Sequence, residues 1–412
     1  SGEQQLSGEI TISGAKNAVL PILFSTLLLN DTTVLHNVPH LRDIQTTITL
    51  LEGLGVEISR EGHSLNIIPR QVSNFSIPYD IVKTMRASIL TLGPLLARYG
   101  RAEVSLPGGC AIGSRPVDMH LKALEKMGTT VSIENGNIVA AVKRRLQGSH
   151  ILFEKVTVTG TENILMAAVL AEGETIIKNA AREPEIIDLA NFLIAAGANI
   201  QGAGTGTITV QGVEALCGAT HTVLADRIEA GTFLAAAMVT SSCLTLKAID
   251  PHILHAVLLK FEEAGAKIDS GRDWITLDMR GKRSTAVDMI TAPYPSFPTD
   301  MQAQLMAVNV FAEGTSTLTE TIFENRFMHV QELQRMGADI RVQGNMAICK
   351  GKPYLTGAPV MATDLRASAG LVVAALGARG ETLVDRVYHI DRGYDGIEKK
   401  LSQVGAKIER VR

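Results

Sequence analysis

Hydrophobic and polar positions along the chain follow one pattern that recurs six times. An amphipathic stretch of helical period ends in Gly and is followed by a short stretch in which apolar and polar residues alternate, as in LLEGLGVEIS at 50–59. Glycine is favoured just after a helix because it adopts the left-handed conformation without a steric penalty. The six glycines at this position are Gly55, Gly128, Gly197, Gly265, Gly337 and Gly405. They lie 68 to 73 residues apart, which predicts six structural repeats.

A second helix, rich in Ala and Gly, precedes each amphipathic helix. An example is ILMAAVLA at 164–171, and a strand such as ETIIKNA at 174–180 lies between the two helices. A helix with little polar surface is buried, whereas alternation along a strand indicates a sheet with one face in water. Each repeat therefore has the order β-α-β-α-β-β, with sheets outside and helices inside. We expect an α/β fold, an inside-out α/β barrel whose six repeats form two pseudo-threefold domains.

The six repeats divide into two predicted domains of three repeats each. Residues 16–224 form the first, which carries a loop around Cys110, and residues 1–15 plus 225–412 form a discontinuous second domain, which carries Asp300. The sixth repeat lacks its last strand before Arg412, so we expect a strand from the N-terminal segment to complete it. We expect the active site in the cleft between the two domains.

Composition and charge narrow the class of protein. Of the 412 residues, 46% are hydrophobic and 20% are charged, which indicates a folded globular chain. The net charge of −3 gives no general attraction to nucleic acid or to anionic membranes. The longest apolar stretch, at 18–29, is too short to span a bilayer. We therefore expect neither nucleic acid nor a membrane as a partner.

The cysteines and histidines form no metal-binding pattern. Cys110, Cys217, Cys243 and Cys349 contain no CxxC pair, and the ten histidines show no HExxH spacing. We expect no metal, no cofactor, and the reduced thiols of a cytoplasmic protein. Cys217, Cys243 and Cys349 lie in strand-like or tightly packed segments, so we interpret them as inert core residues.

Charged residues mark the start of the Ala-rich helix in every repeat. Aligned on the repeat, they are Lys16, Arg86, Glu162, Arg227, Asp300 and Arg366. Four of the six are cations, although the helix dipole disfavours positive charge at an N-terminus. Helix stability therefore does not explain them, whereas an anionic ligand does, because free N–H groups lie there as well.

A second set of arginines lies near the start of the amphipathic helix. Arg42, Arg115 and Arg392 precede the glycine of their repeat by 13 residues, and Arg326 precedes its own by 11. Guanidinium groups bind phosphate and carboxylate in a bidentate manner. Any one of these residues could be a surface arginine paired with Glu or Asp, but the shared register favours a common role. We expect both sets to bind a polyanionic ligand.

Asp300 is a carboxylate at a position where most repeats place a cation. Surrounding arginines would keep it ionised, so it can accept the proton of a substrate hydroxyl. It can equally well cap the helix that follows it. The residues alone leave both roles open.

The segment LPGGCAIGSRP at 106–116 combines three glycines and two prolines, which suits a lid loop. Cys110 lies five residues from Arg115, whose charge favours a reactive thiolate, so this cysteine can be a nucleophile or a proton donor. The G-x4-G spacing is similar to that of the phosphate-binding loop of nucleoside triphosphatases. That loop needs Lys-Ser/Thr where this chain has Ser114-Arg115, so we reject a nucleoside triphosphatase.

Nine motifs together resemble those of the bacterial UDP-N-acetylglucosamine enolpyruvyl transferases. They are SGAKNA (13–18), VKTMRAS (82–88), LPGGCAIGSRPVD (106–118), AAREPEIID (180–188), DRIEAGTF (226–233), FPTDMQAQ (297–304), ENRFMHV (324–330), ATDLRAS (362–368) and YHIDRGY (388–394). The resemblance implies the two-domain inside-out barrel. It also implies transfer of the enolpyruvyl group of phosphoenolpyruvate to the 3′-hydroxyl of UDP-N-acetylglucosamine, with release of phosphate. The implied chemistry is addition and elimination through a tetrahedral intermediate, at the first committed step of peptidoglycan biosynthesis.

The same resemblance implies roles for individual residues. Cys110 is the proton donor and the site of a covalent phosphoenolpyruvate or fosfomycin adduct, Asp300 takes the hydroxyl proton, and Lys16 and Arg392 complete the catalytic set. The residues that bind phosphoenolpyruvate are Lys16, Asn17, Arg115, Arg326, Arg366 and Arg392. The residues that contact UDP-N-acetylglucosamine are Arg86, Arg115, Pro116, Val117, Asp118, Met119, Lys155, Val156, Thr157, Val158, Asp300 and Ile322. Some relatives have Lys where this chain has Arg42, which preserves the charge.

Two other functions fit part of this pattern. The sister enzyme 5-enolpyruvylshikimate-3-phosphate synthase shares the fold and the donor, but the loop with Cys110 favours the amino-sugar acceptor. A non-catalytic anion-binding protein would keep the cations, but it would not need both Cys110 and Asp300. Measured turnover with each acceptor separates these alternatives.

Overall fold

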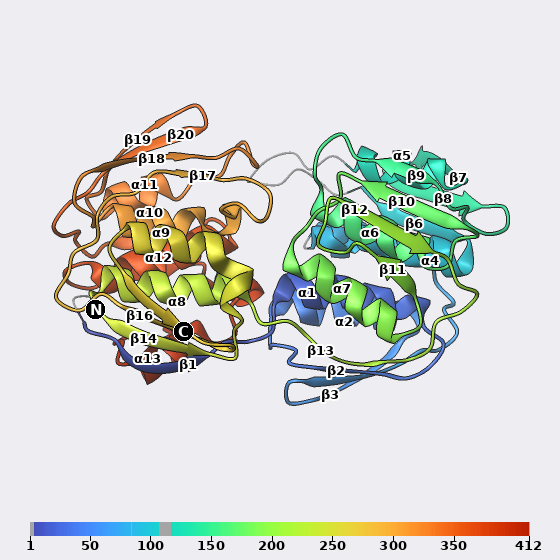
Figure 1. The fold of residues 1–412 in the computed structure, drawn as a ribbon, viewed down its shortest axis with the longest axis horizontal. Coiled ribbons are helices and arrows are strands. Elements are labelled where there is room, and N and C mark those ends of the chain that lie inside the picture. The colour runs from blue at the N-terminus through green and yellow to red at the C-terminus, as the bar shows by residue number, and fades with distance from the viewer. Residues whose placement is uncertain (1–3, 84, 107–116, 412) are drawn as a thin grey trace. The chain divides into compact units, whose positions relative to one another are not determined.

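The protein has a mixed α/β fold (Figure 1). The computed structural model describes residues 4–83, 85–106 and 117–411. The described chain forms two compact units. Residues 14–106 and 117–224 make up one, which we call the N-terminal unit, and residues 4–13 and 225–411 make up the other, the C-terminal unit.

The N-terminal unit contains three four-stranded sheets among its described residues. In spatial order, their strands are β13 (Thr220–Thr222), β2 (Thr33–His36), β4 (Ser64–Ile68) and β3 (Glu57–Glu61); β5 (Ser76–Ile77), β6 (Arg101–Ser105), β8 (Asn137–Val142) and β7 (Thr129–Glu134); and β9 (His150–Leu152), β10 (Glu174–Lys178), β12 (Thr207–Gln211) and β11 (Asn199–Gln201). The helices are α1 (Lys16–Ser25), η1 (Thr26–Leu28), α2 (Arg42–Leu54), α3 (Tyr79–Val82), η2 (Arg86–Thr91), α4 (Leu92–Tyr99), α5 (Asp118–Lys126), α6 (Val158–Ala168) and α7 (Pro184–Ala195), where η denotes a 3-10 helix.

The C-terminal unit contains two four-stranded sheets and one strand pair in the part that the structure describes. Their strands are β1 (Ser7–Thr11), β14 (Cys243–Lys247), β16 (Trp274–Asp278) and β15 (Lys267–Ser270); β17 (Met289–Ile290), β18 (Thr315–Thr319), β20 (Met346–Lys350) and β19 (Asp339–Gln343); and the pair β21 (Pro359–Met361) and β22 (Leu383–Asp385). The helices are α8 (Arg227–Val239), η3 (Pro251–Leu254), α9 (His255–Glu263), η4 (Thr299–Met301), α10 (Gln302–Asn309), α11 (Val330–Arg335), α12 (Leu365–Gly377), η5 (Val387–Arg392) and α13 (Ile397–Gln403).

All five four-stranded sheets share one topology. A parallel strand pair is extended by an antiparallel hairpin, as in β9–β10 followed by β12 and β11. Side chains along β10 alternate between exposed and buried, so this sheet has one wet face and one packed face.

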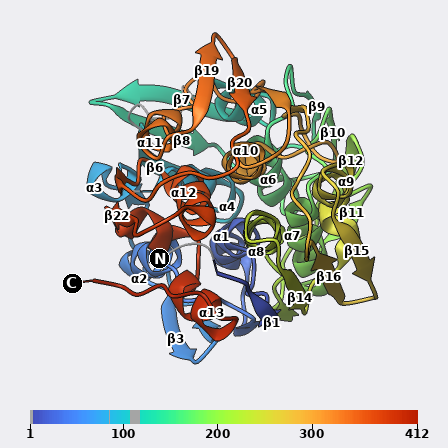
Figure 2. The ribbon, with the colours of Figure 1, turned by 90° about the vertical axis from the view of Figure 1, so that its left-hand side faces the viewer.

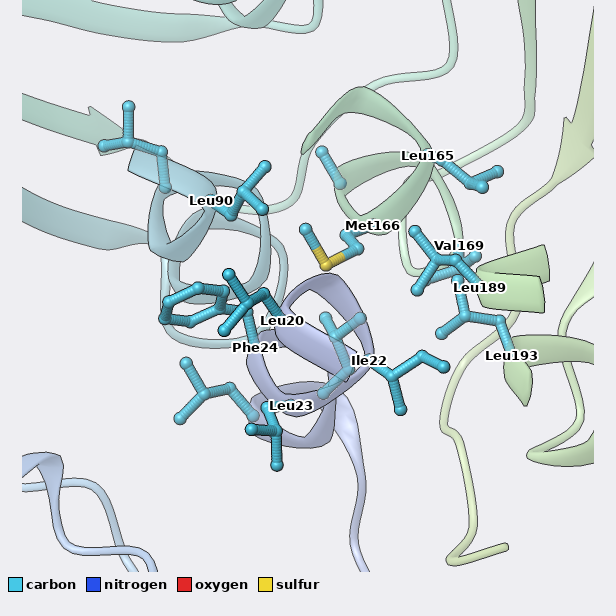
Figure 3. Packing of buried hydrophobic residues seen from close by; sticks show 14 of the residues in the cluster. Leu20, Ile22, Leu23, Phe24, Leu90, Leu165, Met166, Val169, Leu189 and Leu193 are labelled. Atoms are coloured by element: carbon cyan, nitrogen blue, oxygen red, sulfur yellow. The ribbon is translucent and has the colours of Figure 1, made fainter. Parts of the chain in front are cut away.

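The Ala-rich helices are buried, as their lack of polar residues predicts. In α8, every residue from Arg227 to Met238 is buried. Helices α8, α10 and α12 pack against one another within the C-terminal unit, with β14–β16 to one side and β19–β20 to another (Figure 2). In the N-terminal unit α1 packs in the same way among η2, α6 and α7 (Figure 3). The packed side chains shown there are those of α1 itself (Leu20, Ile22, Leu23 and Phe24) and those of the segments around it (Leu90, Leu165, Met166, Val169, Leu189 and Leu193).

The N-terminal strand joins a different repeat from the one predicted. We expected it to complete the sixth repeat, but β1 pairs in parallel with β14 of the fourth repeat, from Ser7 opposite Cys243 to Thr11 opposite Lys247. The strand that precedes α8 in the chain, β13, pairs instead with β2. The edge of β14 that β13 would otherwise cover is therefore open to β1. In the described residues of the sixth repeat, only β21 and β22 pair.

A buried carboxylate anchors the segment that follows β1. The Ser13 N–H donates to Oε2 of Glu229 at 2.7 Å, and Lys400 Nζ donates to Oε1 of Glu229 at 2.8 Å and to Ser13 Oγ at 2.6 Å. Glu229 is 1% exposed. Burial raises its pKa from 4.5 to about 7, although Lys400 and Ser13 act in the opposite direction.

Stability should therefore fall as the pH rises from about 4.5 to about 7. In this pH range the folded chain holds a proton on Glu229 that the unfolded chain has released, so folding takes up a proton. The free energy of unfolding should therefore fall by up to about 3 kcal/mol between pH 4.5 and pH 7. In Glu229→Gln this contribution is absent, so the variant should lose less stability than the wild type over the same range. Calorimetric melting at several pH values measures the difference. Equal slopes for the two proteins would contradict the role of Glu229, whatever the absolute stability of the variant.

None of the helices in the described parts of the chain is long and apolar enough to cross a membrane.

Candidate active site

Lys16 is the first residue of α1 in the N-terminal unit. Its Nζ lies 3.1 Å from Oδ2 of Asp43, which belongs to the first turn of α2 and is 4% exposed. The acidic partner offsets a cation at the positive end of a helix dipole and keeps the ammonium group close to the helix start. Asn17 follows on the same helix and is half-buried, so both side chains lie at the N-terminus of α1.

The other predicted binding residues that the structure describes in this unit lie at three helix starts. Arg86 begins η2 and is half-buried. Val117–Met119 form the entry to α5, which begins at Asp118. Lys155–Val158 lead into α6, where Oγ1 of Thr157 accepts the Gly160 N–H at 3.1 Å and caps the helix. Free N–H groups at such helix starts favour anionic ligands.

Asp300 lies between two buried arginines in the C-terminal unit. Nη2 of Arg326 donates to Oδ1 of Asp300 at 2.8 Å, and Nε of Arg366 donates to Oδ2 at 3.3 Å. The arginine side chains are 6% and 4% exposed, whereas that of Asp300 is 24% exposed. Asp300 is the second residue of η4, whose N-cap is Pro298 and has no side-chain cap. The structure therefore favours the ion-paired carboxylate over the helix cap that the sequence left open.

Arg366 is held from several sides at the start of α12. Oδ1 of Asp364 caps this helix and accepts the Arg366 N–H at 2.9 Å. The guanidinium lies over the ring of Tyr394, 5.4 Å from its centroid. Burial alone would lower the pKa of Arg366, but the neighbouring Tyr394, Asp300 and Asp226 raise it above its usual value. Arg366 therefore stays charged beside Asp300.

Glu320 ties Ile322 to the segment that carries Asp300. One carboxylate oxygen accepts the Ile322 N–H at 2.8 Å, and the other accepts the hydroxyl of Thr299 at 2.8 Å. Thr299 also accepts a hydrogen bond from Nη1 of Arg326 at 3.0 Å. Glu320 is 2% exposed, whereas Ile322 is 37% exposed. The buried carboxylate thus holds the backbone of Ile322, whose apolar side chain is exposed. Arg392 ends η5 in the same unit and is half-buried.

Two sequence interpretations need correction. Glu162, aligned with the helix-start cations, is the fifth residue of α6, one turn past its beginning. It is 3% exposed, and burial, followed by Glu185 and Glu183, raises its pKa well above the usual value. Cys217, interpreted as core, is exposed, because it lies in the connection just before β13. Cys349 is buried, and burial raises its pKa to about 12, which agrees with an inert thiol.

Three predicted site residues lie outside the described part of the chain: Cys110, Arg115 and Pro116. The predicted lid loop extends over the same segment. Sequence reasoning missed Asp43, Glu320 and Tyr394, which support the predicted cations and Ile322. Asp43 follows Arg42 directly and could have been noted as acidic in a first helical turn, but no spacing rule marks the other two. Across the described residues, no group of three or more His, Cys, Asp or Glu could hold a metal ion.

In chemical terms, the C-terminal unit offers a carboxylate in contact with two cations, and the N-terminal unit offers cations at helix starts. Such groups bind phosphates and carboxylates and can accept a proton from a bound hydroxyl.

Comparison with known proteins identifies the class of protein. The family model described as EPSP synthase (3-phosphoshikimate 1-carboxyvinyltransferase) matches residues 1–401. The chain therefore belongs to the EPSP synthase family, and it is a transferase.

Two relatives that align with the whole chain have a more specific name than the family model. The chain is 60% identical over 411 residues to the UDP-N-acetylglucosamine 1-carboxyvinyltransferase of Aeromonas hydrophila, covering 100% of this chain and 98% of the relative. It is 59% identical to the enzyme of the same name from Coxiella burnetii, covering 100% of this chain and 95% of that relative. The resemblance drawn from the nine motifs is thereby confirmed.

Solved structures show the same fold at low sequence identity. The enolpyruvyl transferase NikO from Streptomyces tendae matches with a TM-score of 0.87 at 23% identity, covering 98% of this chain and 96% of NikO. EPSP synthase from Acinetobacter baumannii matches with a TM-score of 0.78 at 19% identity, covering 100% of this chain and 98% of that one.

Proposed function

We propose that this protein transfers the enolpyruvyl group of phosphoenolpyruvate to the 3′-hydroxyl of UDP-N-acetylglucosamine and releases phosphate. The observation that carries the proposal is 60% identity over the whole chain to an enzyme named for this acceptor. The reaction is the first committed step of peptidoglycan biosynthesis, so the enzyme would act in cell-wall formation, cell shape and division. The nucleotide sugar and peptidoglycan precursors are cytoplasmic molecules, and we place the protein there.

The proposed chemistry is addition followed by elimination. A proton passes from the Cys110 thiol to C3 of phosphoenolpyruvate, which leaves C2 electron-poor. The 3′-oxygen of the sugar attacks C2 and gives its proton to Asp300. The tetrahedral intermediate then loses phosphate from C2, which takes the proton held by Asp300, and returns a proton from C3 to the Cys110 thiolate, which restores the double bond. No metal or cofactor takes part in this scheme.

The cations would bind the two anionic reactants. Lys16, Arg115 and Arg392 would hold the phosphate of phosphoenolpyruvate, with Asn17 beside them. Arg326 and Arg366 would hold its carboxylate while they keep Asp300 ionised. Nη1 of Arg366 supports this assignment, because it is buried and has no hydrogen-bond partner within the described structure. An unsatisfied buried donor is costly, and a substrate carboxylate would satisfy it.

The nucleotide sugar would be bound mainly by residues at helix starts. The proposed contacts in the described chain are Arg86, Val117, Asp118, Met119, Lys155, Val156, Thr157, Val158, Asp300 and Ile322, together with Arg115 and Pro116. The finer architecture belongs to the same proposal: an inside-out α/β barrel with six β-α-β-α-β-β repeats in two pseudo-threefold domains. The common topology of the five four-stranded sheets supports it.

Phosphate release tests the acceptor. With phosphoenolpyruvate present, the protein should release phosphate when UDP-N-acetylglucosamine is added and should release none above background with shikimate 3-phosphate. A colorimetric phosphate assay, with Asp300→Ala protein as the blank, measures both rates. Release with shikimate 3-phosphate instead would assign the chain to the EPSP synthase activity for which the family is named. Binding of both substrates without release would make it a non-catalytic anion-binding protein.

A further inference from the structure

One buried amide connects three segments of the N-terminal unit. Asn163 lies in α6 and is 0% exposed. Its Oδ1 accepts the Gly93 N–H at 2.7 Å, and its Nδ2 donates to the Ile89 carbonyl at 3.1 Å. The same Nδ2 lies 3.1 Å from Nδ1 of His120. The side chain of Asn163 thus bonds to η2, to the first turns of α4 and to α5.

These bonds determine the direction of every hydrogen in the network. An amide nitrogen has two hydrogens, and one of them is used by the Ile89 carbonyl. The other points to His120 Nδ1, which must therefore be an acceptor without a proton. The proton of the neutral ring is then on Nε2, where it faces Oγ1 of Thr159 at 3.4 Å. Burial lowers the pKa of His120 to about 4, although Asp118 acts in the opposite direction, so the ring is neutral near pH 7.

The fit around this amide is tight. A Cβ at position 93 would lie 2.3 Å from the backbone oxygen of Asn163 and 2.6 Å from its Oδ1, so only glycine allows this approach. His120 is 3% exposed, and its Nδ1 lies 3.1 Å from Nδ2 of Asn163. Loss of one group would leave another buried and unsatisfied.

Three of the four helices in the network, η2, α5 and α6, also begin at or beside proposed contacts to the nucleotide sugar; α4 does not. Ile89 belongs to η2, which begins at Arg86. His120 directly follows Val117–Met119 on α5. Asn163 and Thr159 belong to α6, and the segment Lys155–Val158 leads into the start of this helix. The sets of contacts are far apart in the chain but are joined through two buried side chains.

We infer that Asn163 and His120 are positioning residues for UDP-N-acetylglucosamine, because they set the relative placement of the three helix starts that bind it. The inference rests on the proposed function. A side chain that only stabilised the fold would affect both substrates alike, whereas a positioning pair in this unit acts on the nucleotide sugar. Small displacements of binding groups are known to weaken affinity and rate strongly.

Two substitutions of His120 separate an effect on nucleotide-sugar binding from a general loss of stability. In His120→Leu the acceptor for Asn163 is lost, so the Kd and KM for UDP-N-acetylglucosamine should rise by about tenfold or more. The KM for phosphoenolpyruvate at saturating nucleotide sugar should stay within about threefold. In His120→Asn the side-chain oxygen replaces Nδ1 as acceptor, so affinity should recover most of the loss. Titration calorimetry with UDP-N-acetylglucosamine and steady-state kinetics measure these values.

Asn163→Ala and Asn309→Ala form a matched pair. Asn309 is also 0% exposed and in a helix, and it bonds to both backbone groups of Val287, at 2.9 and 3.0 Å, in the C-terminal unit. Both variants should melt earlier, but only Asn163→Ala should bind UDP-N-acetylglucosamine more weakly.

The outcomes decide between the inference and the proposed function. Two results would overturn the inference alone, provided that the wild type turns over. The first is an equal loss of affinity for both substrates in His120→Leu, and the second is no recovery of affinity for UDP-N-acetylglucosamine in His120→Asn. Equal binding by the two alanine variants would do the same. Absence of UDP-N-acetylglucosamine binding and turnover in the wild type would overturn the proposed function and the inference with it. A ¹⁵N spectrum of the imidazoles with the proton of His120 on Nδ1 would also contradict the network.

Discussion

Asp300→Ala should lower kcat for enolpyruvyl transfer by about a hundredfold or more, while the Kd for UDP-N-acetylglucosamine changes far less. The carboxylate is partly exposed and ion-paired to Arg326 and Arg366, and in the proposed mechanism it accepts the hydroxyl proton. Its removal also leaves two buried guanidinium groups without that partner, so the variant should melt earlier. Steady-state kinetics and calorimetric binding measure the two effects separately.

Asp300→Asn is the matched variant for this prediction. The amide keeps the shape of the side chain and one acceptor for an arginine, but it cannot take a proton, so kcat should fall nearly as far as in Asp300→Ala. Asp288 in the same unit accepts the Thr317 N–H at 2.7 Å and has no proposed substrate contact, so Asp288→Asn should keep wild-type kcat. A loss of affinity with unchanged kcat in the Asp300 variants would make this residue a ligand contact and not the base.

Cys110→Ser should lower turnover by about a hundredfold or more and abolish inactivation by fosfomycin. A hydroxyl is a much weaker acid and nucleophile than a thiol, so it neither protonates phosphoenolpyruvate nor opens the epoxide efficiently. Cys110→Asp should keep turnover, because a carboxylic acid can also donate a proton, yet it should resist fosfomycin. Turnover assays before and after fosfomycin, with mass spectrometry of the intact protein, detect both effects.

The other cysteines provide the control for this experiment. Cys217 is exposed, and Cys349 is buried with a pKa raised to about 12 by that burial. Cys217→Ser should therefore remain fully sensitive to fosfomycin, with a single adduct on Cys110. An adduct on Cys217, or unchanged fosfomycin sensitivity in Cys110→Ser, would contradict the assignment of the thiol.

Much of the local structure could be predicted from the sequence. The glycine that ends each amphipathic helix has a left-handed backbone, with φ of 108° at Gly55 and 107° at Gly197. The Ala-rich helices α8 and α12 are almost wholly buried. Both features depend on interactions within one helical turn or on the polarity of one face, so the pattern of residues is enough to show them. Family membership followed in the same way, from linear motifs.

The sequence did not reveal which strands pair with each other or which charged residues form ion pairs. The N-terminal strand could complete the open sheet of any repeat, and the choice of β14 depends on β13 pairing with β2. Likewise, Asp300 was expected among arginines, but the sequence did not distinguish its contact with Arg326 and Arg366 from a helix cap. Glu162 was placed one turn too early because α6 begins at Val158 without a charged residue there.

By itself, the sequence determined the buried helices, the set of cations and the family. Only the tertiary structure decided which edge β1 covers, which arginines hold Asp300, and that Asn163 and His120 join three helix starts. The physical reason is the distance along the chain over which each interaction acts. Periodicity and propensity act within a turn or a strand, whereas buried polar groups are satisfied by whichever complement the folded backbone brings near, as Leu6 and Ser242 show across 236 residues.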